Sequence, residues 1–224
     1  MSWTEDWNKH FVATLRRADP TRHVCDAFAD AVHAMALEMV RATVIGEYAR
    51  KCEDEFAEIA ARHGGGYEKT VGELLGIAVC ALEERREDFL GEVLEGIGAA
   101  NTRNGQFFTP RDVAKLCAEI NVSDMKPEPG VVTRIADEAC GASVMLIAQA
   151  EAMLKAGWRQ RDILIHAADI DVRSADISYV QLTLLGYAAK VDCQNTLSLQ
   201  KYRPTWYTIG YFTSCMPMRL REAS

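Results

Sequence analysis

The first hundred residues place apolar side chains with the period of an α-helix. From about Cys25 to His63 these side chains recur at spacings of three to five, and no proline interrupts them, which predicts helical structure. Gly64–Gly66 should end this region, because glycine is a poor helix former that favours turns. The same spacing predicts helices over about Glu68–Arg86 and Asp88–Gly98. We therefore expect a bundle of helices over residues 1–104.

After Gly130 the pattern changes to short apolar and β-branched runs that alternate with helical stretches. Strands are predicted over residues 131–136, 163–168 and 189–192, and helices over about 144–156 and 174–185. This alternation is typical of right-handed crossovers in a parallel sheet. We therefore expect an α/β domain over residues 105–224, with a mainly parallel sheet whose first three strands are adjacent.

Composition narrows the class of protein. The 49% of apolar and 25% of charged residues are ordinary for a soluble globular chain. No apolar run reaches the roughly 18 residues of a membrane span, and residues 1–7 lack the basic-then-apolar pattern of a signal peptide. The seven cysteines include no Cys-x-x-Cys pair, which argues against a disulfide framework and a zinc site. We expect a reduced, cytoplasmic protein without a membrane span.

Charge bears on nucleic-acid binding. The chain carries 25 Lys and Arg residues against 32 Asp and Glu residues, a net charge of −7. DNA binding depends largely on the neutralisation of phosphates by basic side chains, so tight DNA binding by this chain alone is disfavoured. A local basic patch could still form in three dimensions.

Several candidate ligand-binding residues follow the predicted strands, where parallel sheets bind their ligands. The segment Asp137–Gly141 follows the first strand, and its glycine lets a ligand approach the backbone. Asp169 ends the second strand, where a carboxylate can bind both hydroxyls of a ribose, and Asp171 could do the same or cap the next helix. Asn195 follows the third strand. The alternatives are an ordinary loop turn, a solvated carboxylate at Asp169 and a turn asparagine.

Thr109 and Pro110 predict the start of a helix, as a hydroxyl N-cap followed by proline at the first helical position. This does not explain Phe107 and Phe108, which precede them and could be buried core residues instead. His166, inside the second predicted strand, is expected to be a packed core histidine and not a catalytic base.

Three separated motifs occur in a definite order: Gly105-Gln106-Phe107-Phe108-Thr109-Pro110, Asp137-Glu138-Ala139-Cys140-Gly141 and Asp169-Ile170-Asp171, followed by Asn195-Thr196-Leu197. Over roughly residues 85–200 the chain resembles the N6-adenine DNA methyltransferases, in particular the modification subunits of type I restriction systems. The resemblance implies a Rossmann-like domain that binds S-adenosyl-L-methionine. It departs from the family pattern at Glu138, Ser143 and Gln194, where the family has proline, glycine and glycine.

The resemblance also implies roles for individual residues. The aromatic segment closes over the cofactor, the Ala-Cys-Gly loop wraps its methionine part, Asp169 binds the ribose and Asn195 faces the adenine, where it can pair with the exocyclic amine. The implied cofactor-binding residues are Phe107, Phe108, Thr109, Pro110, Asp137, Ala139, Cys140, Gly141, Asp169, Asp171 and Asn195. Of these, Asp169, Gly141 and Phe108 are expected to line one pocket.

The catalytic motif of the family, Asn/Asp-Pro-Pro-aromatic, is not found: none of the six prolines is adjacent to another. The nearest aromatic segment, Tyr202–Tyr207, lacks the paired prolines. Three interpretations stay open. The chain is a methyltransferase-like protein that reaches DNA through a partner specificity subunit or an oligomer, such as a homodimer, and is active with that partner or through a cryptic base site. It is a cofactor-binding accessory or antirestriction protein of a mobile element that does not methylate, or it is a structural remnant that binds no cofactor.

Overall fold

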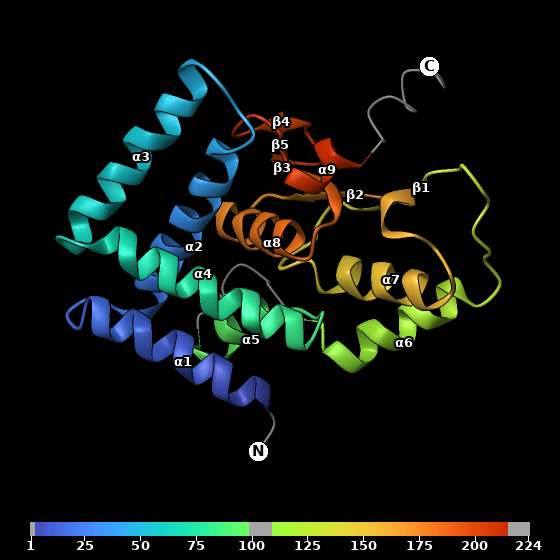
Figure 1. Cartoon of the computed structure of the whole chain (residues 1–224), viewed down its shortest axis with the longest axis horizontal. Coiled ribbons are helices and arrows are strands. Elements are labelled where there is room, and N and C mark those ends of the chain that lie inside the picture. Colours follow the sequence, from blue (N-terminus) through green and yellow to red (C-terminus); the bar gives the residue numbers. More distant parts are fainter. Residues whose placement is uncertain (1–2, 99–108, 215–224) are drawn as a thin grey trace. The chain divides into compact units, whose positions relative to one another are not determined.

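The computed structural model describes residues 3–98 and 109–214 (Figure 1). The chain forms two compact units, one of Met1–Arg85 with Phe89–Phe108 and one of Arg86–Asp88 with Thr109–Ser224. The first is helical and the second is α/β, as predicted. Within the described ranges, no helix has the length and the apolar character needed to cross a membrane.

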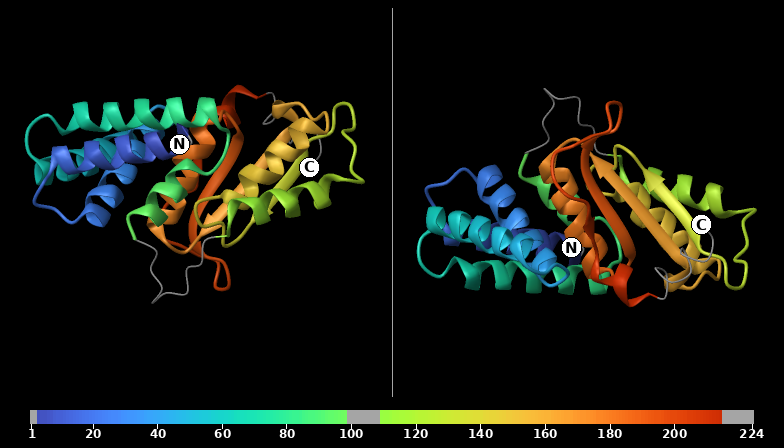
Figure 2. Two further views of the ribbon diagram at one scale, coloured as in Figure 1. Left: turned by 90° about the horizontal axis from the view of Figure 1, so that it is seen from below. Right: turned by 90° about the horizontal axis from the view of Figure 1, so that it is seen from above.

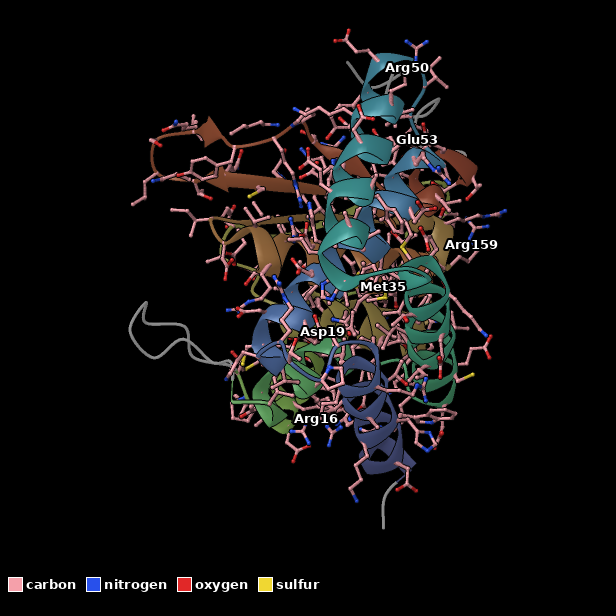
Figure 3. The ribbon with its side chains drawn as sticks, turned by 90° about the vertical axis from the view of Figure 1, so that its left-hand side faces the viewer. Arg16, Asp19, Met35, Arg50, Glu53 and Arg159 are labelled. Atoms are coloured by element: carbon pink, nitrogen blue, oxygen red, sulfur yellow. The ribbon has the colours of Figure 1, made fainter. Side chains whose placement is uncertain are left out.

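The helical unit consists of α1 (Trp3–Ala18), α2 (Val24–Arg41), α3 (Glu47–His63), α4 (Tyr67–Glu84) and α5 (Phe89–Gly96). Its core is built on aromatic contacts, with the ring of Phe11 centred 6.0 Å from Phe28 and 5.8 Å from Phe89. Met35 is fully buried among these helices, whereas Arg50 and Glu53 lie exposed on α3 (Figure 3). The helix α2 is buried on nearly all sides, whereas α3 buries only Cys52 and Ile59 among its described side chains, so the core of this unit is centred on α2.

The prediction of unbroken helical structure from about Cys25 to His63 is wrong at residues 42–46. The helix ends at Arg41 and a new one begins at Glu47. Gly46 has a φ of +73°, a left-handed conformation that an α-helix does not allow. The amide and the hydroxyl of Thr43 both donate to the carbonyl of Val40, each at 2.8 Å, and so close the last turn of α2.

The described residues of the α/β unit form a five-stranded sheet whose first three strands along the chain are parallel. The elements are α6 (Arg111–Val122), β1 (Thr133–Asp137), α7 (Val144–Lys155), the 3₁₀ turn η2 (Gln160–Asp162), β2 (Ile163–Asp169), α8 (Val172–Leu184), β3 (Ala188–Asn195), β4 (Gln200–Lys201), β5 (Trp206–Tyr207) and α9 (Ile209–Thr213). Strands β1, β2 and β3 are adjacent and parallel (Figure 2), which confirms the prediction. β4 and β5 both pair antiparallel with β3.

The register of the parallel strands aligns their carboxyl ends. Asp137, the last residue of β1, lies opposite Ala167 of β2, and Asp169, the last residue of β2, lies opposite Cys193 of β3. Asn195 ends β3 two residues later. The sheet thus brings the three polar strand ends to one edge, where open parallel sheets bind ligands.

The helix that follows the aromatic segment begins one residue later than predicted. Its N-cap is Pro110 and not Thr109, and its first helical residue is Arg111. Pro110 has φ −56° and ψ 136°, an extended conformation, although its carbonyl already accepts hydrogen bonds from the amides of Val113 and Ala114 at 3.0 Å. The fixed φ of proline suits this extended conformation as well as a helical one.

Candidate functional site

The loop after β1 is folded by its own backbone amides. The amide of Ala139 donates to Oδ1 of Asp137 at 3.0 Å, and the amide of Cys140 donates to the carbonyl of Ala168 in β2, also at 3.0 Å. Gly141 has a φ of +54°, and a Cβ atom built on it would meet no protein atom within 4 Å. The space beside Gly141 is therefore open to a ligand, while the glycine satisfies the left-handed backbone.

Asp169 joins this loop to the end of β2. Its Oδ2 accepts a hydrogen bond from the amide of Gly141 at 2.8 Å, and its Oδ1 accepts one from the amide of Asp171 at 2.8 Å. A carboxylate has about four acceptor sites, so each oxygen keeps one for a ligand. The structure thus brings Asp169 and Gly141 together. Phe107 and Phe108, the aromatic residues expected beside them, lie outside the described residues.

Burial raises the pKa of Asp169, and the neighbouring carboxylates of Asp171 and Asp137 act in the same direction. The two backbone amides lower the pKa but do not cancel the effect of burial. The residue is 8% exposed. In the described contacts, the donors to Asp169 are two neutral backbone amides. Further hydrogen-bond donors, such as those of a ligand, would stabilise its charge.

Asp171 caps α8, which is the alternative that the sequence left open for it. Its side chain accepts a hydrogen bond from the amide of Arg173 at 3.0 Å, and it has the extended backbone of an N-cap. The guanidinium of Arg173 lies 3.6 Å from its other oxygen. This arrangement assigns Asp171 to the start of the helix, and leaves Asp169 as the better placed of the two carboxylates for a ligand.

The side chain of Asn195 accepts hydrogen bonds from the backbone of the turn that follows it. Its Oδ1 accepts hydrogen bonds from the amides of Leu197 and Ser198, at 3.0 and 3.2 Å. The two lone pairs of this oxygen are thus occupied, so an exocyclic amine, which donates, finds no free acceptor on it. The Nδ2 group remains a donor, which suits a ring nitrogen of adenine better. The neighbouring Thr196 donates to the carbonyl of Glu138 at 3.0 Å and so ties this turn to the β1 loop.

Cys140 and Ser143 belong to the loop after β1, and both are buried. Burial raises the pKa of Cys140 to about 12, so its thiol stays protonated at neutral pH and is no nucleophile. Ser143 occupies the position where the family has its second glycine, and it keeps a glycine-like φ of +70°. Its hydroxyl donates to that of Ser178 in α8 at 2.7 Å. Ser143 thus adopts a backbone conformation that glycine takes without strain.

Two exposed apolar side chains at this edge were missed by sequence reasoning. Ile170, between the two aspartates, is 57% exposed, and Leu197 is 99% exposed. Ligand pockets combine apolar surface with a few convergent polar groups, so these side chains are candidates for contact with a ligand at Asp169. The only signal in the sequence was an apolar residue within a loop of acids and turn formers, which is a weak one.

The aromatic segment after β3 is largely committed to packing. Trp206 is buried and meets Tyr179 of α8 edge to face, with ring centres 5.2 Å apart. The guanidinium of Arg203 lies over the ring of Trp206, 3.4 Å from its centre. Tyr202 remains about half exposed. Trp206 therefore cannot serve as a base-stacking residue without leaving the core.

His166 was expected to be a packed core histidine. Instead, it belongs to a network of polar side chains. Its Nε2 lies 2.8 Å from Oδ2 of Asp192, which is 3% exposed. The Nζ of Lys201 and the hydroxyl of Thr205 donate to the other oxygen, at 2.6 and 2.5 Å. Burial alone would raise the pKa of Asp192, but these three hydrogen bonds outweigh it and hold the pKa well below its usual range.

A family model described as N-6 DNA methylase matches residues 85–210, more than half of the chain. No curated protein matches the chain. The matched range contains the β1 loop, Asp169 and Asn195, and ends within α9. The mainly parallel sheet of the α/β unit is compatible with a Rossmann-like methyltransferase domain. The chain therefore belongs to the N-6 DNA methylase family.

Proposed function

We propose that this chain binds S-adenosyl-L-methionine at the carboxyl ends of β1, β2 and β3. The single observation that supports this most is the state of Asp169. It is held in place by two backbone amides, it keeps an acceptor site on each oxygen, and it lies beside the open space next to Gly141. A pair of ribose hydroxyls offers two donors of the kind that this carboxylate can still accept.

The other residues of the site would hold the remaining parts of the cofactor. The backbone beside Gly141 gives room for the methionine portion, and Ile170 and Leu197 offer apolar surface to the adenine ring. The Nδ2 of Asn195 would donate to a ring nitrogen. When bound, S-adenosyl-L-methionine supplies a methyl group on a positively charged sulfur. The carboxylates of Asp169 and Asp137 would also favour the positive charge of the cofactor.

We further infer that the chain is related to the type I modification subunits but does not methylate DNA alone. Methylation of an amine requires the nitrogen to lie in line with the donor methyl, and a misplacement of about 1 Å can reduce the rate about a hundredfold. The sequence holds no Asn/Asp-Pro-Pro-aromatic element, and Trp206 is buried. The net charge of −7 favours DNA contact through a partner specificity subunit or an oligomer.

Two measurements on the purified chain test this proposal. Calorimetric titration with S-adenosyl-L-methionine should show binding at one site per chain, and its absence would overturn the cofactor assignment. Transfer of labelled methyl groups to adenine-containing DNA should stay at background. Transfer above background by the chain alone would contradict the second inference. Binding without transfer even beside a specificity subunit would favour the accessory or antirestriction function instead.

A further inference from the structure

Two buried polar side chains of α8 donate hydrogen bonds to the backbone of the loop after β1. The hydroxyl of Ser178 donates to the carbonyl of Gly141 at 2.8 Å. The Nε2 of Gln181, one helical turn further on, donates to the carbonyl of Ala142 at 2.9 Å. Both side chains are 0% exposed. Positions three apart lie on the same face of a helix, so α8 presents two hydrogen-bond donors to two consecutive loop carbonyls.

Each donor is fixed by a further partner. Ser178 accepts a hydrogen bond from the hydroxyl of Ser143 at 2.7 Å, which leaves its own proton directed at Gly141. Gln181 also donates to Oδ1 of Asp88, which is buried, at 2.8 Å. Hydrogen bonds in such chains polarise and strengthen one another. The loop is thus held through Ser143–Ser178 on one side and through Asp88–Gln181 on the other.

From these contacts we infer that Ser178 and Gln181 are positioning residues for the cofactor loop, an inference that rests on the proposed function. The loop has left-handed conformations at Gly141 and Ser143, φ +54° and +70°. Such a backbone keeps one shape only when its surroundings fix it. Fixing the Gly141 and Ala142 carbonyls holds the Gly141 amide against Asp169 and keeps the open side of the glycine toward the ligand. Neither residue belongs to the motifs that the sequence singled out.

The same network explains how a serine serves where the family has a glycine. A serine at φ +70° is strained by its Cβ atom, and its hydroxyl is satisfied by donation to Ser178. Ser178 therefore acts twice, as the acceptor that stabilises Ser143 and as the donor that holds Gly141.

The test compares Ser178→Ala and Gln181→Met with Thr183→Ala. Thr183 lies on the same helix and its hydroxyl bonds the carbonyl of Tyr179 at 2.7 Å, so the control removes a similar hydrogen bond away from the loop. Three quantities are measured on each full-length variant: the dissociation constant for S-adenosyl-L-methionine, hydrogen exchange of the amides of residues 139–143 in the free protein, and the urea midpoint. Asp88→Asn serves as a conservative variant, since it keeps an oxygen for Gln181.

We expect Ser178→Ala and Gln181→Met to weaken cofactor binding about 3- to 10-fold for each hydrogen bond lost and to speed exchange of the Cys140 and Gly141 amides. Thr183→Ala and Asp88→Asn should leave both within about twofold of the wild-type values, since they keep both hydrogen bonds to the loop carbonyls. A purely structural role would shift the urea midpoint alike in Ser178→Ala and Thr183→Ala, without selective exchange in the loop. Ser178→Ala keeps a good helix former in α8 and decides the question if Gln181→Met does not fold.

Unchanged dissociation constants in both variants would overturn the inference, whether or not the loop exchanges faster. If the wild-type protein binds no S-adenosyl-L-methionine, the proposed function fails. Loop exchange then decides the positioning role by itself: selectively faster exchange in the two variants supports it, and exchange equal to that of Thr183→Ala overturns it.

Discussion

Asp169 and Asp192 are two buried carboxylates on neighbouring strands, and the protein surrounds them in opposite ways. Asp169, at the end of β2, accepts hydrogen bonds from two backbone amides, and burial raises its pKa. Asp192, inside β3, accepts hydrogen bonds from His166, Lys201 and Thr205, and these hold its pKa below its usual range. Asp169 thus has two neutral donors, whereas Asp192 has three donors, one of them the ammonium of Lys201.

This difference distinguishes a candidate ligand-binding carboxylate, Asp169, from a structural one, Asp192. The three partners of Asp192 fasten the β3 strand to β2 and to the segment 201–205, and they leave this carboxylate little capacity for a ligand. Asp169 keeps capacity on both oxygens at the edge where the strands end. A raised carboxylate pKa in a parallel sheet edge is typical of a functional position. The following variants test whether Asp192 contributes mainly to stability and Asp169 mainly to cofactor binding.

The largest effect on stability is expected for Asp192→Ala. Removal of the carboxylate leaves three donors without their acceptor, although Lys201 and His166 are exposed enough to be hydrated in part. We expect a loss of about 2–4 kcal/mol in the free energy of unfolding, measured by urea denaturation. Asp169→Ala should lose less than about 1 kcal/mol, because its ionised form is disfavoured by burial. An equal loss in the two variants would remove the distinction.

Cofactor binding should be lost at a higher pH than the stability that Asp192 provides. The pKa of Asp169 lies above the ordinary value of 3.8, so protonation begins above that pH and takes away acceptor sites from the ribose. The lowered pKa of Asp192 means that its stability contribution is present above 3.8 and is lost only as the pH falls through the folded-state value. We therefore expect cofactor binding to weaken on mild acidification, about tenfold for each pH unit below the pKa of Asp169, while circular dichroism shows an intact fold. Loss of fold and of binding at the same pH would contradict this.

Ser143 offers a smaller test, confined to the loop that holds Asp169. Ser143→Ala keeps the strained backbone and loses the hydrogen bond to Ser178, whereas Ser143→Gly loses the bond but relieves the strain. We expect Ser143→Gly to be more stable than Ser143→Ala by about 1 kcal/mol, in urea denaturation of both proteins. A reversed order would mean that the left-handed conformation of Ser143 carries no strain.

The smallest effect is expected for Asp171→Ala. Loss of the N-cap of α8 should lower the free energy of unfolding by about 0.5–1 kcal/mol, by thermal or urea denaturation. Cofactor binding should change less than about threefold, because the side chain serves the helix and not the ribose. A larger loss of affinity, at an unchanged stability, would place Asp171 in the binding site beside Asp169.

The sequence predicted the α/β unit well because its elements are fixed by local patterns. β2 was expected to end at Asp169 and does, and the helix pattern from Val144 matches α7 within one residue. The break at Gly46 and the late start at Arg111 were missed, because a left-handed glycine or an extended proline is set by the surrounding chain. A helical period does not report them.

The site was predicted unevenly for a similar reason. Asp169 and Gly141 follow predicted strands, so topology alone brings them together at one edge. Ser178 and Gln181 could not be found, since polar residues within a helical pattern are read as solvent-exposed until the packing is known. Likewise, nothing in the sequence indicates that both lone pairs of the Asn195 oxygen are taken by backbone amides.

Paired calorimetric titrations of wild-type protein, Asp169→Ala and Asp171→Ala with S-adenosyl-L-methionine test the central claim most directly. The account predicts that Asp169→Ala weakens binding by about 1.5–3 kcal/mol, the range for the loss of hydrogen bonds to a charged group. Asp171→Ala, two residues away and of the same charge change, should bind nearly as the wild type does. Equal affinity of Asp169→Ala and wild-type protein would contradict the assignment of Asp169 to the ribose.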